Sequence, residues 1–118
     1  MNKRISIILT TLLFLATFVA CASDSVLETT QNSISMENTR SDVNLGETVF
    51  FEAGTWINIE LTSSRGSVDI SITSETGNTP YNMEGLEDAS HSVQITESAY
   101  YTIRIIGNNH TGQIRLSW

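Results

Sequence analysis

The chain is 118 residues long, has a formal net charge of −7 at pH 7 and contains a single cysteine. This length suits at most one ordinary domain, and one cysteine closes no intramolecular disulfide and builds no cysteine-rich zinc site. The acidic balance argues against nucleic acids as partners, because a negative surface repels phosphate backbones.

The first twenty residues have the pattern of an export signal. Asn2, Lys3 and Arg4 make a short basic start, and an uncharged apolar run follows over residues 5–20. This run is shorter than the roughly 20 apolar residues of a membrane-spanning helix, and it has no polar face with the helical period. We therefore predict a signal peptide over residues 1–20.

The cysteine stands where such a signal would be cut. Phe18-Val19-Ala20-Cys21 resembles the lipobox of bacterial lipoprotein signals, with Phe18 in place of the usual leucine. The resemblance implies cleavage before Cys21 and attachment of diacylglycerol to its thiol, which would hold the chain on the extracytoplasmic face of the cell membrane. The same letters allow a second interpretation. Ala20-Cys21-Ala22 is an A-x-A site, and cleavage after Ala22 would give a freely secreted form.

Removal of the signal makes the remaining chain more acidic. Four arginines then face all thirteen carboxylates, so the net charge becomes about −9. Such a chain is not attracted to an anionic lipid surface by charge. We therefore expect the membrane partner to be engaged through the lipid on Cys21, and stable anchoring requires more than one acyl chain.

Residues 21–43 are predicted to be the lipidated cysteine followed by a flexible tether. Serine, threonine, asparagine and acidic residues dominate this segment, and no apolar residue recurs with a regular period. Ile34 and Met36 are the exception, because they could begin an edge strand.

Short strands are expected throughout the predicted domain, residues 44–118. Apolar and β-branched residues alternate there with polar ones, and breaks containing glycine or asparagine recur. The expected strands cover residues 48–52, 56–62, 67–73, 81–83, 92–96, 100–106 and 113–118. This pattern predicts an all-β fold of about seven to eight short strands in a jelly-roll-like antiparallel β-sandwich, with a closed barrel as the lesser alternative.

Three segments of this domain resemble a known accessory domain. Gly54 with residues 57–61, then residues 68–70, and then residues 101–105 are similar to the pre-peptidase C-terminal domain, a small β-sandwich of many secreted bacterial peptidases. Residues 98–99 hold no glycine where that family has one, and the final strand lacks its tyrosine pattern. The resemblance implies a non-catalytic accessory or binding module, in a family in which some members bind calcium or insoluble polymers, and it supplies no ligand residue.

Groups suited to catalysis do not converge in the sequence. Asp88, Ser90 and His91 name the members of a hydrolase triad, but such triads are assembled by the fold, and no G-x-S-x-G motif occurs. Glu84, Glu87 and Asp88 form an acidic loop without the spacing of a calcium loop, and we expect it to be solvated. We therefore predict a protein that is not an enzyme and that uses no cofactor or metal.

Trp56 and Tyr100 are the candidate ligand-facing residues. Both have outward parity in their predicted strands, and exposed aromatic rings are typical of binding surfaces. Packing at a sheet edge is the alternative role. The sequence thus predicts an extracytoplasmic lipoprotein whose non-catalytic module binds an envelope protein or polysaccharide. A structural or protective envelope protein without a specific ligand is the alternative that the sequence leaves open.

Overall fold

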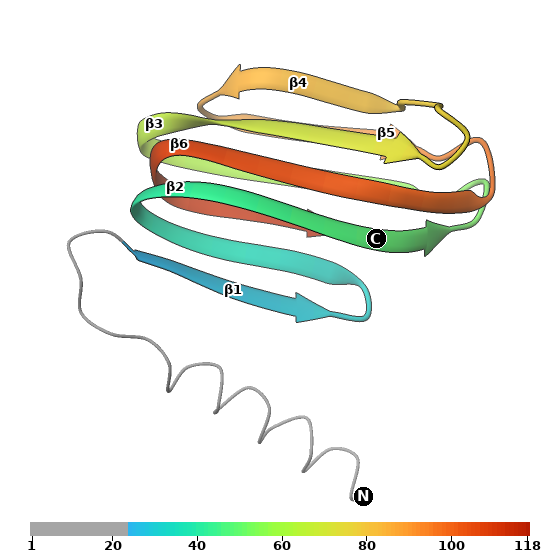
Figure 1. Ribbon diagram of the computed structural model, residues 1–118, viewed down its shortest axis with the longest axis horizontal. Coiled ribbons are helices and arrows are strands. Elements are labelled where there is room, and N and C mark those ends of the chain that lie inside the picture. Colours follow the sequence, from blue (N-terminus) through green and yellow to red (C-terminus); the bar gives the residue numbers. More distant parts are fainter. Residues whose placement is uncertain (1–23) are drawn as a thin grey trace, which may run out of the picture.

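A computed structural model describes residues 24–118, which form six β-strands (Figure 1). The strands are β1 (Asp24–Thr30), β2 (Ser33–Phe51), β3 (Trp56–Ser74), β4 (Tyr81–Leu86), β5 (Ala89–Gln94) and β6 (Ala99–Ser117). All of their pairings are antiparallel, so the predicted all-β antiparallel class is confirmed. The predicted signal peptide and Cys21 lie outside the described residues. The part of the chain that is described holds no helix long and apolar enough to cross a membrane.

The strands are fewer and longer than the sequence pattern predicts. β2, β3 and β6 each have 19 residues. β3 joins the predicted strands 56–62 and 67–73, and β6 joins 100–106 and 113–118. The intervening segments were expected to be breaks, but strand pairing continues through them with register shifts. Glycine and asparagine are typical of β-bulges as well as of turns, so composition alone does not separate the two.

The predicted flexible tether is wrong for residues 24–43. β1 and the first half of β2 occupy this segment as an antiparallel hairpin. Ile34 and Met36 are 2% and 3% exposed and belong to the core, and β2 lies between β1 and β6, so this part of β2 is not an edge strand. The apolar alternation stops after Met36 because the next inward position is Asn38, a buried polar residue. The folded unit therefore begins by residue 24 rather than at residue 44.

All six strands belong to one hydrogen-bonded sheet rather than to two separate sheets. The strand order is β1-β2-β6-β3-β4, and β5 pairs with β3 as well. β3 has room for both neighbours because residues 56–61 pair with β5, whereas residues 68–72 pair with β4. β2 similarly pairs with β1 only through its first half, up to Thr39. The two halves of the sheet thus have different edge strands.

The sheet bends across the middle of its three long strands (Figure 1). The register shifts fall within residues 38–43, 63–67 and 107–112, which we call the bend end. Positive φ angles at Arg40, Gly66 and Asn109 accompany these shifts, and bulges of this kind bend a strand and increase its twist. We call the opposite end, with the connections at residues 31–32, 52–55, 75–80 and 95–98 and the C-terminal Trp118, the loop end.

The core lies on the inner face of this bent sheet. The alternating inward residues of the long strands are almost completely buried: Ile57, Ile59, Leu61, Val68, Ile70, Ile72, Tyr101, Ile103, Ile105, Ile114 and Leu116. Side chains from the two halves of the sheet meet at the loop end, where the rings of Phe51 and Trp118 contact edge to face at 5.2 Å. The core of residues 24–118 is therefore built from side chains of this one sheet, because the described strands are accompanied by no helix.

Candidate functional site

A row of hydrogen-bonded polar side chains, buried at Asn38 and His110, connects the strands at the bend end. His110, on β6, is 0% exposed. Its Nδ1 lies 3.0 Å from Nδ2 of Asn38 on β2, and its Nε2 lies 2.9 Å from Oγ of Ser63 on β3. Ser25 on β1 donates a hydrogen bond from Oγ to Oδ1 of Asn38 at 2.7 Å. Four strands are therefore joined through side chains at the point where the sheet bends.

The bonds of Asn38 determine which nitrogen of His110 carries the proton. Because Oδ1 of Asn38 accepts from Ser25, its Nδ2–H group is the donor to His110. Nδ1 of the ring is then an acceptor, and Nε2–H donates to Ser63 Oγ. Burial lowers the pKa of His110 below its ordinary value, although a hydrogen bond to the backbone of Thr62 opposes this effect. The fold therefore favours the neutral ring.

This Ser–His–Asn row has the opposite polarity to a catalytic triad. In a triad the serine donates to the histidine, which acts as a base and makes the serine oxygen a nucleophile. Here the ring of His110 donates to Ser63, so the arrangement does not activate the hydroxyl. The row satisfies polar groups that the bend would otherwise bury without partners, as buried polar groups require.

The three residues that name a triad in the sequence have unrelated partners in the structure. Oδ1 of Asp88 accepts a hydrogen bond from the backbone N–H of Ser63 at 3.0 Å. Nδ1 of His91 lies 2.6 Å from the hydroxyl of Tyr81. Ser90 is exposed on β5 and is opposite Glu60 on β3. Ser90 and His91 are consecutive residues of a strand and therefore point to opposite faces.

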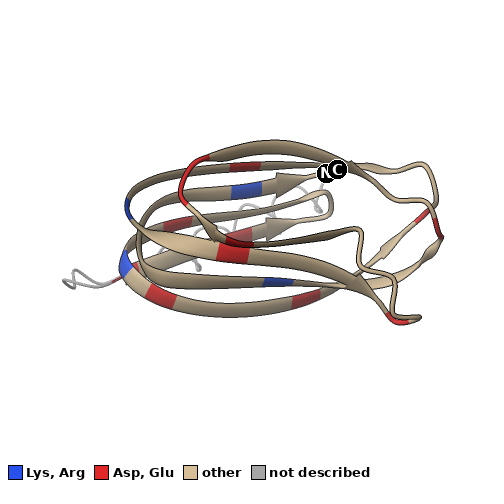
Figure 2. Ribbon diagram, turned by 90° about the horizontal axis from the view of Figure 1, so that it is seen from above, with Lys and Arg blue, Asp and Glu red and all other residues tan. Residues whose placement is uncertain are grey.

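The acidic loop is exposed, as the sequence pattern predicts, at Glu84, Glu87 and Asp88. Within residues 24–118, no group of three histidine, cysteine, aspartate or glutamate side chains is placed to hold a metal ion. Figure 2 shows acidic residues distributed along the strands and connections of both halves of the sheet, with few basic residues among them. Carboxylates are therefore a general property of this surface rather than the mark of one site.

The aromatic side chains of the described residues gather toward the loop end. Phe51, Tyr81 and Tyr101 are buried there, and the rings of Phe51 and Tyr101 lie 5.8 Å apart. Burial raises the pKa of the Tyr101 hydroxyl above its ordinary value, and the charge of Glu97 raises it further. This hydroxyl donates to the carbonyl oxygen of Glu97 at 2.6 Å, which links β6 to the connection that precedes it. These buried rings close the core at this end.

Three other aromatic rings at the loop end are exposed to solvent. Trp56 and Tyr100 are each 53% exposed, and Phe50 is 48% exposed. Phe50 and Tyr100 are directly opposite each other on β2 and β6, and their rings contact edge to face with centroids 5.2 Å apart. Such a pair holds both rings in a fixed orientation. The pair lies on the outer face, so the core does not need it.

Threonines adjoin this aromatic pair on the same outer face. Thr48 on β2 is opposite Thr102 on β6, which in turn is opposite Thr73 on β3. Because residues two apart on a strand share a face, these three positions lie next to Phe50 and Tyr100. We call the five residues the aromatic–threonine surface. It combines apolar rings with hydroxyl groups on the outer face of the sheet.

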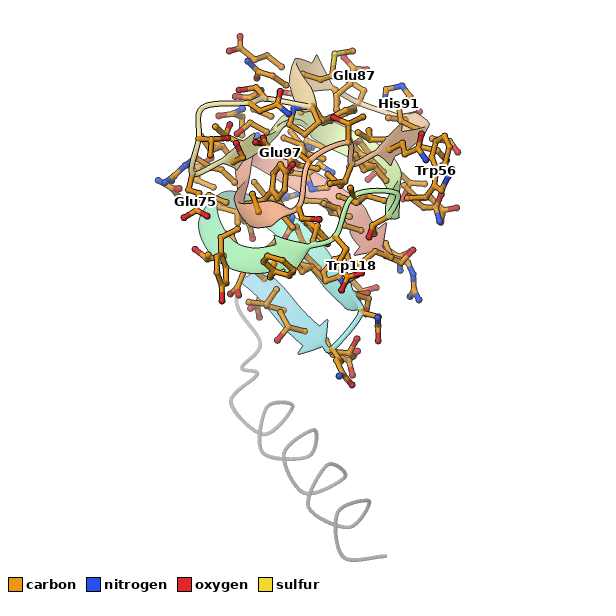
Figure 3. All side chains as sticks on the ribbon, turned by 90° about the vertical axis from the view of Figure 1, so that its right-hand side faces the viewer. Trp56, Glu75, Glu87, His91, Glu97 and Trp118 are labelled. Carbon is orange, nitrogen blue, oxygen red and sulfur yellow. The ribbon has the colours of Figure 1, made fainter. Side chains whose placement is uncertain are left out.

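The two predicted ligand-facing residues are exposed, but they do not share a face. Trp56 is opposite Gln94 in the half of the sheet that contains β5, whereas Tyr100 belongs to the half formed by β2, the start of β6 and the end of β3. Figure 3 shows Trp56 at the periphery of the loop end, apart from Trp118. Phe50 was not singled out from the sequence, because adjacent phenylalanines reveal their faces only once the partner strand is known.

Comparisons with known proteins give little further information. No protein-family model matches this chain, and no curated protein matches it. A similar solved structure is a chain of the "Glycosylation Associate Protein (Gap123) complex from Streptococcus agalactiae", with 14% sequence identity and a TM-score of 0.41. The match covers 81% of this chain and 39% of that chain, so this chain spans about two fifths of its length. A similarity at this level supports no statement about function.

Proposed function

We propose that this chain is an extracytoplasmic lipoprotein, anchored through Cys21, whose non-catalytic domain binds a polysaccharide of the cell envelope. The domain acts as a β-sandwich in which the two halves of the bent sheet form the layers. The likeness to the pre-peptidase accessory domain supports such a binding role, and the lipobox at Phe18-Val19-Ala20-Cys21 supports the anchor.

The observation that supports ligand binding most directly is the exposed pair of Phe50 and Tyr100. These rings are about half exposed and are held against each other, although the core is closed by other side chains. Exposed aromatic rings suit the apolar faces of sugar rings, and neighbouring threonine hydroxyls suit sugar hydroxyl groups. The acidic surface favours a neutral polysaccharide, because a phosphate- or carboxylate-bearing polymer would be repelled.

Retention of the protein on insoluble envelope polysaccharide tests this proposal. We expect the double variant Phe50→Ala/Tyr100→Ala to lose binding by about tenfold or more, since the loss of about 1.4 kcal/mol of contact energy changes an affinity tenfold. Met83→Ala is the matched control, because Met83 is 42% exposed but lies on β4, outside the aromatic–threonine surface.

Three results would contradict the polysaccharide proposal. If the double variant and Met83→Ala reduced retention equally, the polysaccharide would bind at a different surface. Absence of retention on polysaccharides, together with capture of an envelope protein that depends on Phe50 and Tyr100, would replace the ligand class. Failure to bind either would favour the alternative of a structural or protective envelope protein.

A further inference from the structure

The chain enters the folded domain at the bend end. Asp24, the first residue of β1, is opposite Thr39 at the end of the first half of β2. The hydroxyl of Ser41 donates a hydrogen bond to the backbone carbonyl of Asp24, and this places Asp24 beside the bend of β2. Ser25 is tied through Asn38 to His110, which lies within the same bend. The start of β1 is thus fixed to the bend end by backbone and side-chain bonds.

Very little chain separates this point from the anchor. Only Ala22 and Ser23 lie between Cys21 and Asp24. Three residue steps span at most about 11 Å when fully extended. The polar headgroup layer on one side of a bilayer is itself roughly 5–8 Å thick. A lipid on Cys21 therefore leaves no room for a wide gap between Asp24 and the headgroups.

The short connection does not hold the loop end near the bilayer in the same way. Each half of a long strand has about nine residues, which at roughly 3.3 Å per residue gives a length of about 30 Å. The bend end must therefore face the bilayer or lie very near it, whereas the loop end is free to lie some 30 Å farther out. This length is several times the reach of the connection from Cys21.

The exposed residues of the bend end are polar. They include Arg40, Asp42, Ser64, Arg65 and Asn108, and the described residues place no aromatic side chain there. Arg40 and Arg65 are two of the four arginines that follow Cys21. Groups of both charges with hydrogen-bond donors and acceptors suit zwitterionic headgroups, which carry a phosphate and an ammonium group. An aromatic or apolar surface would instead favour insertion among the acyl chains.

We propose that the bend end is a membrane-apposed surface that contacts zwitterionic lipid headgroups and directs the aromatic–threonine surface of the loop end away from the bilayer. This inference rests on the proposed lipid anchor at Cys21. The short connection and the place where β1 begins keep the bend end at the bilayer. The lipid supplies the attachment, and the polar bend end rests on the headgroups without inserting.

Quenching of tryptophan fluorescence by headgroup-labelled lipid tests this orientation. The purified lipidated full-length product is reconstituted in phosphatidylethanolamine–phosphatidylcholine vesicles that contain a lipid with a headgroup-attached quencher. Trp56 and Trp118 both lie at the loop end, so the wild-type protein should show little quenching. Ser64→Trp adds a third tryptophan at an exposed position of the bend end. About a third of the total tryptophan emission of this variant should therefore be quenched.

Thr96→Trp is the matched control, because Thr96 is also exposed but lies in a connection of the loop end. Its emission should stay unquenched. Asn108→Trp provides a second probe of the bend end should Ser64→Trp fold poorly. Equal quenching at residues 64 and 96, or quenching at residue 96 alone, would overturn the inference.

The intact mass of the reconstituted protein distinguishes failure of the orientation from failure of the proposed function. A protein that carries the acyl groups but shows no selective quenching of the bend-end tryptophans overturns the orientation alone. A protein without acyl groups overturns both the anchor and the orientation. Selective quenching of the acylated protein supports both.

Discussion

His110 shows how a single polar residue can organise the interior of this fold. It is fully buried and is bonded to Asn38 and Ser63 on two neighbouring strands. A protonated ring would have donors on both nitrogens, so Nδ1 could no longer accept from the Nδ2–H group of Asn38. Burial also lowers its pKa. Protonation of this residue therefore opposes folding.

The pH dependence of stability follows from that lowered pKa. The unfolded chain, with an ordinary histidine pKa near 6.5, binds the proton more readily than the folded one, so the free energy of unfolding rises with pH in this range. The contribution is complete above about pH 6.5 and is lost as the pH falls through the lower folded pKa. The free energy of unfolding can be measured in urea at pH 7.5 and at pH 5.5. On going to the lower pH it should fall less for His110→Gln than for the wild type.

His91→Gln serves as the control for this measurement, because His91 is only partly buried and is bonded to Tyr81 on the opposite side of the core from the bend. Since His91 is the only other histidine of the sequence, a pH effect that His110→Gln changes and His91→Gln does not is assigned to the buried ring. If the free energy of unfolding fell by the same amount between pH 7.5 and pH 5.5 in His110→Gln and in the wild type, His110 would not titrate as the structure implies.

The bends are the elements that give the long strands their shape. Gly66 has a φ of +74°, and a Cβ at this position would collide with the backbone carbonyl oxygens of Asn108 and Asn109 on β6. Glycine is thus required here for two reasons, the positive φ and the close approach of β3 to β6.

Gly66→Ala should therefore lower the free energy of unfolding by more than the same substitution at another glycine with a positive φ. Gly85→Ala is the control, because Gly85 has a similar φ of +68° but no atom within 4 Å of an added Cβ. We expect a loss of about 1 kcal/mol for Gly85→Ala and at least twice that for Gly66→Ala, since backbone strain alone costs on the order of 1–3 kcal/mol. Denaturant unfolding measures both, and equal losses would contradict the role given to the bend.

The strand faces could be predicted from the sequence, but the number of strands could not. Alternation correctly placed Val68, Ile70 and Ile72 in the core, because a period of two residues identifies a one-sided strand whatever its partner is. The sequence pattern predicts breaks near Gly66 and Gly112, because residues that allow a turn also allow a bulge. Only pairing with a distant strand decides between them.

Residues 24–43 and part of the candidate site escaped prediction for a related reason. The inward position of Asn38 is explained by its bond to His110, which lies 72 residues farther along the chain. Phe50 likewise became recognisable only from its register with Tyr100. The exposure of Trp56 and Tyr100 was predicted because it depends on local parity alone, and their placement in different halves of the sheet was not.

The molecule as a whole has two chemically different ends. The bend end holds the buried row of His110 and an exposed polar surface, and β1 begins there. The loop end holds the aromatic side chains of residues 24–118, with some rings closing the core and others exposed. A lipid joined to the bend end and a ligand bound at the loop end would use this difference, with the bent sheet as a rigid spacer between them.

The intact mass of the membrane-associated protein, compared with that of Cys21→Ala, tests the lipid anchor most directly. The account predicts that the wild-type product begins at Cys21, carries acyl groups and partitions into the detergent phase. Cys21→Ala should lack the acyl mass and move to the aqueous phase. A wild-type product that is already in the aqueous phase and begins at Ser23 would contradict the account, because it would show cleavage after Ala22 and release from the membrane.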